Sequence, residues 1–231
     1  MKTFKKFIRG FLSKYLGKFY YRKDSYSQEG EDLVIERLLE GKRGGFYVEV
    51  GCHHPYRFSN TYLFYKMGWR GVCIDPLPGT KILFNKNRPR DICIEKGVDE
   101  KEGELTYFMF NDPALNTFDE KLAIDRDNIR GCHLIDQVKI KVESLASILD
   151  GLNEIPRIDF LSIDAEGFDL QVLKSNDWDK FNPKIVIAEC LTARLSEINS
   201  DPVALYLKSL NYFVFAKTGC SIIFMKNEAD N

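Results

Sequence analysis

The sequence lacks the long apolar runs of a membrane-spanning protein, since no stretch approaches the roughly 20 residues that a helix needs to cross a bilayer. Its opening segment also lacks the continuous apolar core and small-residue cleavage site of a secretory signal. Neither sign of charge is in excess, because 33 basic and 34 acidic residues give a formal net charge of −1. We therefore expect a cytoplasmic protein and no nucleic-acid partner.

Closely spaced cysteine pairs are absent as well. The six cysteines are spread widely, and none forms a CxxC pair. A zinc cluster or a disulfide framework needs tighter grouping. Several cysteines lie inside apolar runs such as GVCID and DICIE, which favours small buried side chains in a reducing compartment.

The first 25 residues differ in character from the remaining domain, 26–231. Eight Lys or Arg residues and a single acid fall in the first 24 positions. Over residues 4–19 the apolar side chains recur at helical spacing and the basic ones occupy the opposite face. The pattern predicts a basic amphipathic helix, which suits peripheral association with the inner face of an anionic membrane. The alternative is that its apolar face packs on the domain, or on a second subunit of a homo-oligomer.

Short apolar runs alternate with helical patterns along the rest of the chain. Strands are predicted at 46–50, 70–74, 91–98, 158–163 and 184–188, with helices at 28–40, 60–67, 79–88, 168–174 and 201–210. The β-α-β-α-β order indicates an α/β fold with a parallel, doubly wound sheet. Residues 104–110 either extend this sheet or form a hairpin. The chain is expected to close with an antiparallel hairpin at 211–217 and 221–226.

Acidic residues follow the predicted strands. Glu49, Asp75, Asp164 and Glu189 come at or just after four strand ends, and Asp99 follows the third strand. Ligands of open parallel sheets bind outside the carboxyl ends of the strands. A single acid there is commonly a helix cap, but four or five on one edge indicate a binding site.

Phosphate-binding glycine patterns are missing at this edge. Only Gly51 follows the first strand, so neither GxGxxG nor GxxxxGK[ST] is present. S-adenosylmethionine carries no phosphate, and its ammonium, sulfonium and ribose diol all favour carboxylates. On this reasoning Glu49 binds the methionyl end and Asp75 the ribose. An NAD-dependent or nucleotide-sugar enzyme shares the second-strand acid and remains an alternative.

Five segments together resemble the FkbM family of S-adenosylmethionine-dependent methyltransferases. They are SQEGED, FYVEVGCHHP, SNTYLFYKMGWRGVCIDPLP, PALNTF and FLSIDAEGFDLQVLKS, which lie within residues 26–190. The resemblance implies a class I methyltransferase fold, Rossmann-like, with seven strands and an antiparallel closing strand. It also implies O-methylation of a hydroxyl on a sugar, glycan or related polyhydroxylated substrate, as in polysaccharide biosynthesis. A non-catalytic S-adenosylmethionine-binding subunit is a further alternative.

The same resemblance assigns the cofactor site. It places Glu49 and Gly51 in the cofactor loop and Asp75 on the ribose. Asp164 and Glu166 are expected to face both cofactor and substrate, so that Asp164 has a catalytic role as well.

Removal of the acceptor's proton needs a base or a metal. His54 is the first candidate for the base, because a neutral imidazole titrates near physiological pH. The alternative is that His54 holds the loop through a backbone hydrogen bond, and His53 and His133 are weaker candidates. In a second mechanism Asp164 and Glu189, with or without His54, bind a divalent cation such as Mg²⁺ or Mn²⁺.

Neutral polar residues border the expected site. Asn60, Asn116, Thr117 and His133 are predicted to contact a hydroxyl-rich substrate, although caps and turns are the ordinary role of Asn and Thr. Tyr56, Arg57 and Phe58 are expected near the acceptor.

Overall fold

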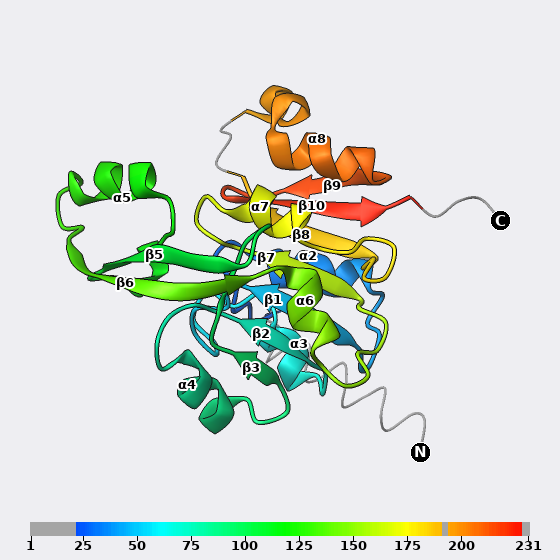
Figure 1. The fold of residues 1–231 in the computed structure, drawn as a ribbon. Coiled ribbons are helices and arrows are strands. Elements are labelled where there is room, and N and C mark those ends of the chain that lie inside the picture. The colour runs from blue at the N-terminus through cyan, green and yellow to red at the C-terminus, as the bar shows by residue number, and fades with distance from the viewer. Residues whose placement is uncertain (1–21, 191–193, 228–231) are drawn as a thin grey trace, which may run out of the picture.

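A seven-stranded sheet forms the centre of the computed structural model, which describes residues 22–190 and 194–227 (Figure 1). Its strands are β1 (Phe46–Val50), β2 (Arg70–Ile74), β3 (Ile92–Ile94), β7 (Phe160–Ile163), β8 (Ile185–Glu189), β9 (Tyr212–Lys217) and β10 (Ser221–Lys226). They lie in the order β3-β2-β1-β7-β8-β10-β9. The first five in this order are parallel, whereas β10 runs antiparallel to both β8 and β9. The predicted doubly wound sheet with its antiparallel closing strand is confirmed.

Helices cover both faces of the sheet, because side chains alternate between the two faces along each strand. One face packs on Ile35, Phe64 and Phe84 from three helices, and Tyr47 of β1 points to this side. These helices are α2 (Glu31–Leu38), α3 (Tyr62–Lys66) and α4 (Thr80–Asn87). The opposite face, which includes Val48, packs on α6 (Leu145–Asp150), α7 (Asp169–Lys174) and α8 (Pro202–Ser209). Between β8 and α8 lies a short 3-10 helix, η2 (Leu195–Ser200).

A hairpin arm, residues 103–143, projects beyond the main sheet (Figure 1). Its strands β5 (Gly103–Phe110) and β6 (Leu134–Glu143) are antiparallel, and with β4 (Gly97–Val98) they form a second sheet in the order β4-β6-β5. The arm also carries the short helix η1 (Pro113–Leu115) and α5 (Glu120–Asp127). Residues 104–110 therefore form a hairpin and do not extend the main sheet.

The predicted third strand is divided between the two sheets. Residues 91–98 form β3, which pairs with β2, and β4, which pairs with β6. Asp99 therefore follows a strand of the smaller sheet, and its N–H donates to the Glu143 carbonyl. The acid that follows β3 is Glu95, whose carboxylate accepts from the N–H groups of Gly79 (2.9 Å) and Lys81 (3.2 Å) at the start of α4. Asp99 is thus no part of the site edge.

The first described helix begins later than the sequence predicts. The Ser27 hydroxyl accepts from the N–H of Gly30 (3.1 Å) and of Asp32 (3.3 Å), so it stabilises a turn. Gly30 follows with φ +89°, and α2 starts at Glu31. Because Gly30 lies in the left-handed region, the helix cannot include the residues before it.

Other expectations concern the cysteines and the N-terminus. None of the six cysteines, all of which lie in the described ranges, forms a disulfide, and five of them are buried as predicted. No helix in the described part of the chain is long and apolar enough to cross a membrane. The predicted amphipathic helix at residues 4–19 lies outside the described residues.

Candidate active site

Two adjoining cavities open at the carboxyl ends of β1, β2, β7 and β8. The first, which we call the cofactor cavity, encloses about 760 Å³ including its mouth. The second, the acceptor cavity, encloses about 1000 Å³ on the same basis. Both are lined by Gln28, Phe58, Ala114, Asp164 and Glu166. The two cavities therefore adjoin at these shared residues.

Gly51 joins the first strand to the wall of the cofactor cavity. Its φ is +78°, and a Cβ atom built on it would lie 1.7 Å from the Asp164 carbonyl oxygen. Its N–H donates to the Ile74 carbonyl at 2.9 Å. The exits of β1 and β7 thus approach so closely that only glycine fits between them. The structure places Gly51 in the cavity lining, where the sequence led us to expect it.

Asp75 lies at the end of β2 and lines the same cavity. The residue is 4% exposed, and its carboxylate accepts from the N–H groups of His53 (2.6 Å) and Leu77 (2.8 Å). Burial raises its pKa to about 6, and the two N–H donors oppose that rise. A carboxylate has about four acceptor sites, so capacity remains for a ribose diol.

Glu49, in contrast, points away from both cavities. It shares a sheet face with Tyr47, and its carboxylate accepts from the Thr61 hydroxyl at 2.6 Å. The Arg88 guanidinium lies 3.9 Å away, and burial raises the pKa of Glu49 to about 7. This placement does not support contact with the methionyl end of a cofactor, because the side chain lies under the sheet face covered by α3.

The sequence did not indicate a role for Arg88, yet its side chain binds the cofactor loop, which follows β1, from within the core. It is fully buried and donates to Asp91 (2.7 Å), to the Tyr47 hydroxyl (2.9 Å) and to the Pro55 carbonyl (3.2 Å). Pro55 belongs to the loop that follows β1, so the guanidinium ties this loop to the strand before it. The sequence RPRD shows no pattern that distinguishes Arg88 from a surface arginine.

The histidines occupy three different places. The Nδ1 atom of His54 accepts from the N–H groups of Tyr56 (3.3 Å) and Arg57 (3.1 Å), so the ring stabilises the turn and lines neither cavity. This is the alternative role named for it, and it does not support a base or a metal ligand. His53 lines the cofactor cavity, and burial lowers its pKa. His133 is exposed on the hairpin arm outside both cavities.

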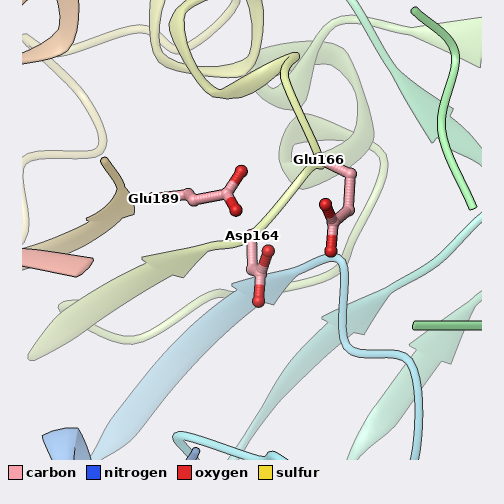
Figure 2. Close-up of side chains that lie close together, drawn as sticks. All are labelled: Asp164, Glu166 and Glu189. Carbon is pink, nitrogen blue, oxygen red and sulfur yellow. The ribbon is translucent and has the colours of Figure 1, made fainter. Parts of the chain in front are cut away.

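Three carboxylates meet where the cavities join (Figure 2). One oxygen each from Asp164, Glu166 and Glu189 lie within 4.8 Å of one another. Asp164 has surface open to the cavities, yet protein atoms surround it on the other sides. This desolvation raises the pKa of Asp164 well above its usual range, and the charges of Glu166 and Glu189 raise it further. Burial and then Glu166 raise the pKa of Glu189 to about 8. Figure 2 shows the three groups facing one space.

Glu166 is the one member of this cluster with a cationic partner among the described residues. Arg126 of α5 donates to its carboxylate and also to the Leu115 carbonyl at 2.6 Å. The Thr117 hydroxyl donates to the Glu166 carbonyl at 2.7 Å. The hairpin arm is therefore fastened to the β7 exit at Glu166. Glu166 is not one of the five acids that the sequence places at strand ends, and only the DAEG motif indicated it.

Three of the four residues predicted to contact the substrate line one of the cavities, and His133 lines neither. Asn60 lines the acceptor cavity and donates to the Ser162 hydroxyl at 3.0 Å. Asn116 and Thr117 line the cofactor cavity instead. The structure therefore brings Asn60 to the acceptor side but places Asn116 and Thr117 with the cofactor loop.

An ion pair joins the loop after β1 to the hairpin arm at the wall of the acceptor cavity. Both terminal nitrogens of Arg57 donate hydrogen bonds to the Asp112 carboxylate, at 2.9 and 2.8 Å, and both side chains are 42% exposed. This bond lowers the pKa of Asp112 to about 2. We call this pair the Arg57–Asp112 clasp.

Backbone strain is concentrated around the cofactor cavity. Six described residues other than glycine have positive φ, and three of them line this cavity: His53 (+45°), Phe58 (+57°) and Glu166 (+49°). Such conformations persist only where the surrounding structure imposes them, and they are frequent at functional sites.

The charges of the cofactor cavity suit a ligand without phosphate. Three carboxylates line it, from Asp75, Asp164 and Glu166, against one cation, Lys96, which is paired with Glu143. A pyrophosphate needs unpaired N–H groups or free cations. The residues present fit the sulfonium, ammonium and diol of S-adenosylmethionine, and they do not fit a dinucleotide.

Comparison with known proteins agrees with this geometry. The family described as "Methyltransferase FkbM domain" matches residues 49–214. No curated protein sequence matched the chain.

Solved methyltransferase structures resemble the chain at low sequence identity. A precorrin-6Y C5,15-methyltransferase from Geobacter metallireducens has 10% identity and a TM-score of 0.47, covering 88% of this chain and 93% of that one. An S-adenosylmethionine-dependent O-methyltransferase from Thermotoga maritima has 10% identity and a TM-score of 0.47, covering 92% and 71%. Because the family match spans well over half of the sequence and the sheet has the expected strand order, the chain belongs to the FkbM family of methyltransferases.

Proposed function

We propose that this protein is an S-adenosylmethionine-dependent O-methyltransferase that acts on a hydroxyl of a sugar, glycan or related polyhydroxylated molecule. The observation that carries the proposal is the junction of the two cavities at Asp164 and Glu166. A methyl donor in one cavity and an acceptor in the other would meet beside these carboxylates.

Asp164 is the base in this proposal. S-adenosylmethionine supplies an electrophilic methyl group, and the acceptor hydroxyl must lose its proton as its oxygen is methylated. The Asp164 carboxylate borders both cavities, and its raised pKa makes it a stronger proton acceptor than an exposed aspartate. Glu189, also in the acceptor cavity, can share the proton, since the two carboxylates interact. Asp164 thus takes the role first assigned to His54.

The acceptor cavity favours a hydroxyl-rich ligand over an anionic one. Its two guanidiniums are each committed to a carboxylate, Arg57 to Asp112 and Arg126 to Glu166. Carboxylates there remain to accept from hydroxyl groups, whereas a phosphate or carboxylate on the acceptor would be repelled. This balance supports a sugar or other polyol.

A second mechanism uses a divalent cation. The oxygens of Asp164, Glu166 and Glu189 are spaced closely enough to bind Mg²⁺ or Mn²⁺, with Glu166 in the place once considered for His54. The cation would lower the pKa of the acceptor hydroxyl. Activity that survives exhaustive EDTA treatment would exclude this mechanism, and activity that returns only on adding Mg²⁺ or Mn²⁺ would establish it.

Calorimetry and a transfer assay test the proposal together. We expect the wild type to bind S-adenosylhomocysteine and not NAD, and to release S-adenosylhomocysteine with at least one compound from a panel of glycosides and lipid-linked glycans. Asp164→Asn, which keeps the size of the side chain, should retain S-adenosylhomocysteine binding and lose about 100-fold or more in turnover. Binding without turnover on any acceptor would favour a non-catalytic subunit, and tight binding of NAD alone would overturn the proposal.

Membrane placement is a separate part of the proposal. Lipid-linked glycans are assembled at the cytoplasmic face of membranes, and the basic amphipathic pattern at residues 4–19 suits that surface. We expect deletion of residues 1–24 to abolish binding to anionic liposomes while transfer to a soluble glycoside is retained. Equal liposome binding by both forms would remove this part. Size-exclusion chromatography with light scattering on both forms would show whether the segment mediates homo-oligomerisation instead.

A further inference from the structure

Asn116 carries an unsatisfied hydrogen-bond donor in the wall of the cofactor cavity. The residue is 5% exposed, and its Nδ2 atom is one of three buried side-chain N or O atoms in the described residues that have no partner. The other two, on Thr80 and Asn176, belong to residues outside the lining of this cavity. Buried polar groups are nearly always paired, so an exception in a ligand cavity points to a partner supplied by the ligand.

The orientation of this amide is fixed by its neighbours. The Oδ1 atom of Asn116 accepts from the Phe110 N–H at 2.7 Å, which directs Nδ2 to the opposite side. The next residue, Thr117, exchanges backbone hydrogen bonds with Phe108, at 2.8 and 3.1 Å. Its hydroxyl also bonds to the Glu166 carbonyl. The segment cannot rotate to satisfy Nδ2 elsewhere without breaking these bonds.

Contacts of this segment place it beside β4, whose Val98 lines the cofactor cavity together with Asp75. The Phe118 ring packs so closely on Gly97 that an added Cβ there would lie 2.7 Å from it. The same ring stacks on Tyr107 at 4.8 Å between centroids. Burial raises the pKa of Tyr107 well above its usual range, and the neighbouring Asn116 amide opposes that rise, although the two groups do not meet in hydrogen-bond geometry. Even with the Tyr107 hydroxyl turned to accept from Nδ2, the second N–H of this carboxamide would have no partner.

We propose that Asn116 is a nucleoside-binding residue, whose Nδ2 donates to an acceptor atom on the adenosine part of the cofactor. The adenine ring nitrogens and the ribose oxygens are acceptors that a carboxamide NH₂ can meet. Contact with the methyl acceptor is disfavoured, since Asn116 does not line the acceptor cavity. This inference rests on the proposed function and revises the substrate-binding role that the sequence suggested for Asn116.

The test compares two ligands that share the nucleoside. S-adenosylhomocysteine has both nucleoside and amino-acid parts, whereas 5′-methylthioadenosine has the nucleoside alone. Calorimetry on Asn116→Ala and Asn116→Asp at pH 8 should show the Kd of both ligands raised about tenfold. The aspartate keeps an oxygen for the Phe110 N–H, so a loss of binding in this variant reports the missing donor. Thermal unfolding of each variant checks that the fold is intact.

Asn176→Ala is the matched control, because Asn176 is also a buried amide with an unpartnered atom but lies outside the cavity. It should leave both Kd values unchanged. Unchanged binding of S-adenosylhomocysteine in the Asn116 variants would overturn the inference alone. So would weaker binding of S-adenosylhomocysteine with unchanged 5′-methylthioadenosine, which would place the contact at the amino acid. A wild type that binds neither ligand would overturn the proposed function and this inference with it.

Discussion

Replacement of Arg88 by methionine should destabilise the protein strongly, because it strips the cation from a buried cluster of acids. Arg88 and Asp91 are fully buried at the side chain and 2.7 Å apart, and Glu49 lies 3.9 Å from the guanidinium. Removing one partner of a buried ion pair costs about 3–5 kcal/mol, since the remaining charge has no compensation. In a domain of this size each kcal/mol lowers Tm by about 2–4 °C. We therefore expect Tm to fall by about 6–20 °C.

Two comparisons isolate the electrostatic cause. Arg70→Met removes an exposed arginine at the start of β2 and should change the free energy of unfolding by about 0.5 kcal/mol or less. In Arg88→Met the additional changes Glu49→Gln and Asp91→Asn should restore much of the stability, because no buried charge then remains unpaired.

The pH dependence of Arg88→Met gives a further check. Burial already raises the folded-state pKa of Glu49 to about 7, and loss of the cation, which opposes this rise, raises that pKa further, so the folded state binds extra protons. Stability is then retained at low pH and lost as pH rises through the folded pKa. The deficit relative to wild type, measured by urea unfolding, should grow from pH 5 to pH 8. A deficit below about 1 kcal/mol, or one independent of pH, would refute the reasoning.

Three further predictions concern the site. Gly51→Ala should abolish S-adenosylhomocysteine binding, measured by calorimetry, because the new Cβ would clash with the Asp164 carbonyl. The control Gly68→Ala should bind normally, since Gly68 has a similar φ of +95° but open space around it. An equal loss of binding in both variants would show that φ alone, and not the clash, is the cause. Unfolding free energy of the wild type should fall as pH rises from about 4.5 to 8, because burial raises the folded pKa of Asp75 to about 6, of Asp169 to about 7 and of Glu189 to about 8. Glu189→Gln should flatten the upper part of that curve, and an unchanged slope would contradict the assignment. Arg57→Gln should speed S-adenosylhomocysteine dissociation in stopped-flow measurements, and added salt should speed dissociation from wild type more than from the variant, since the clasp is exposed and screened.

The sequence allowed the edge of the sheet to be predicted, but not the direction of every side chain on it. Asp75 and Gly51 lie where expected, because a strand end in a parallel sheet fixes the position of the residue that follows. Glu49 is inside its strand, and both faces of a parallel sheet are covered by helices, so the sequence could not show which environment it enters. The consequence is that the residue chosen for the methionyl end proved to be a partner of Arg88.

Residues whose roles depend on distant contacts were beyond sequence reasoning. The donor on Asn116 is unpaired only because Phe110 takes its oxygen, and Arg88 matters only because a turn 33 residues away passes over it. His54 shows the same limit. Its ring was assigned to chemistry from its place after the strand, whereas the N–H groups of the turn occupy its nitrogen.

The attachment of the hairpin arm at Glu166 connects the cofactor cavity with the acceptor cavity. Arg126 and Thr117 of the arm hold the side chain and the carbonyl of a residue that borders both cavities. A ligand that shifts Glu166 on one side changes the free energy of binding on the other, and such coupling is equal in both directions. Cofactor affinity, measured with and without an acceptor, therefore reports any coupling that passes through Glu166.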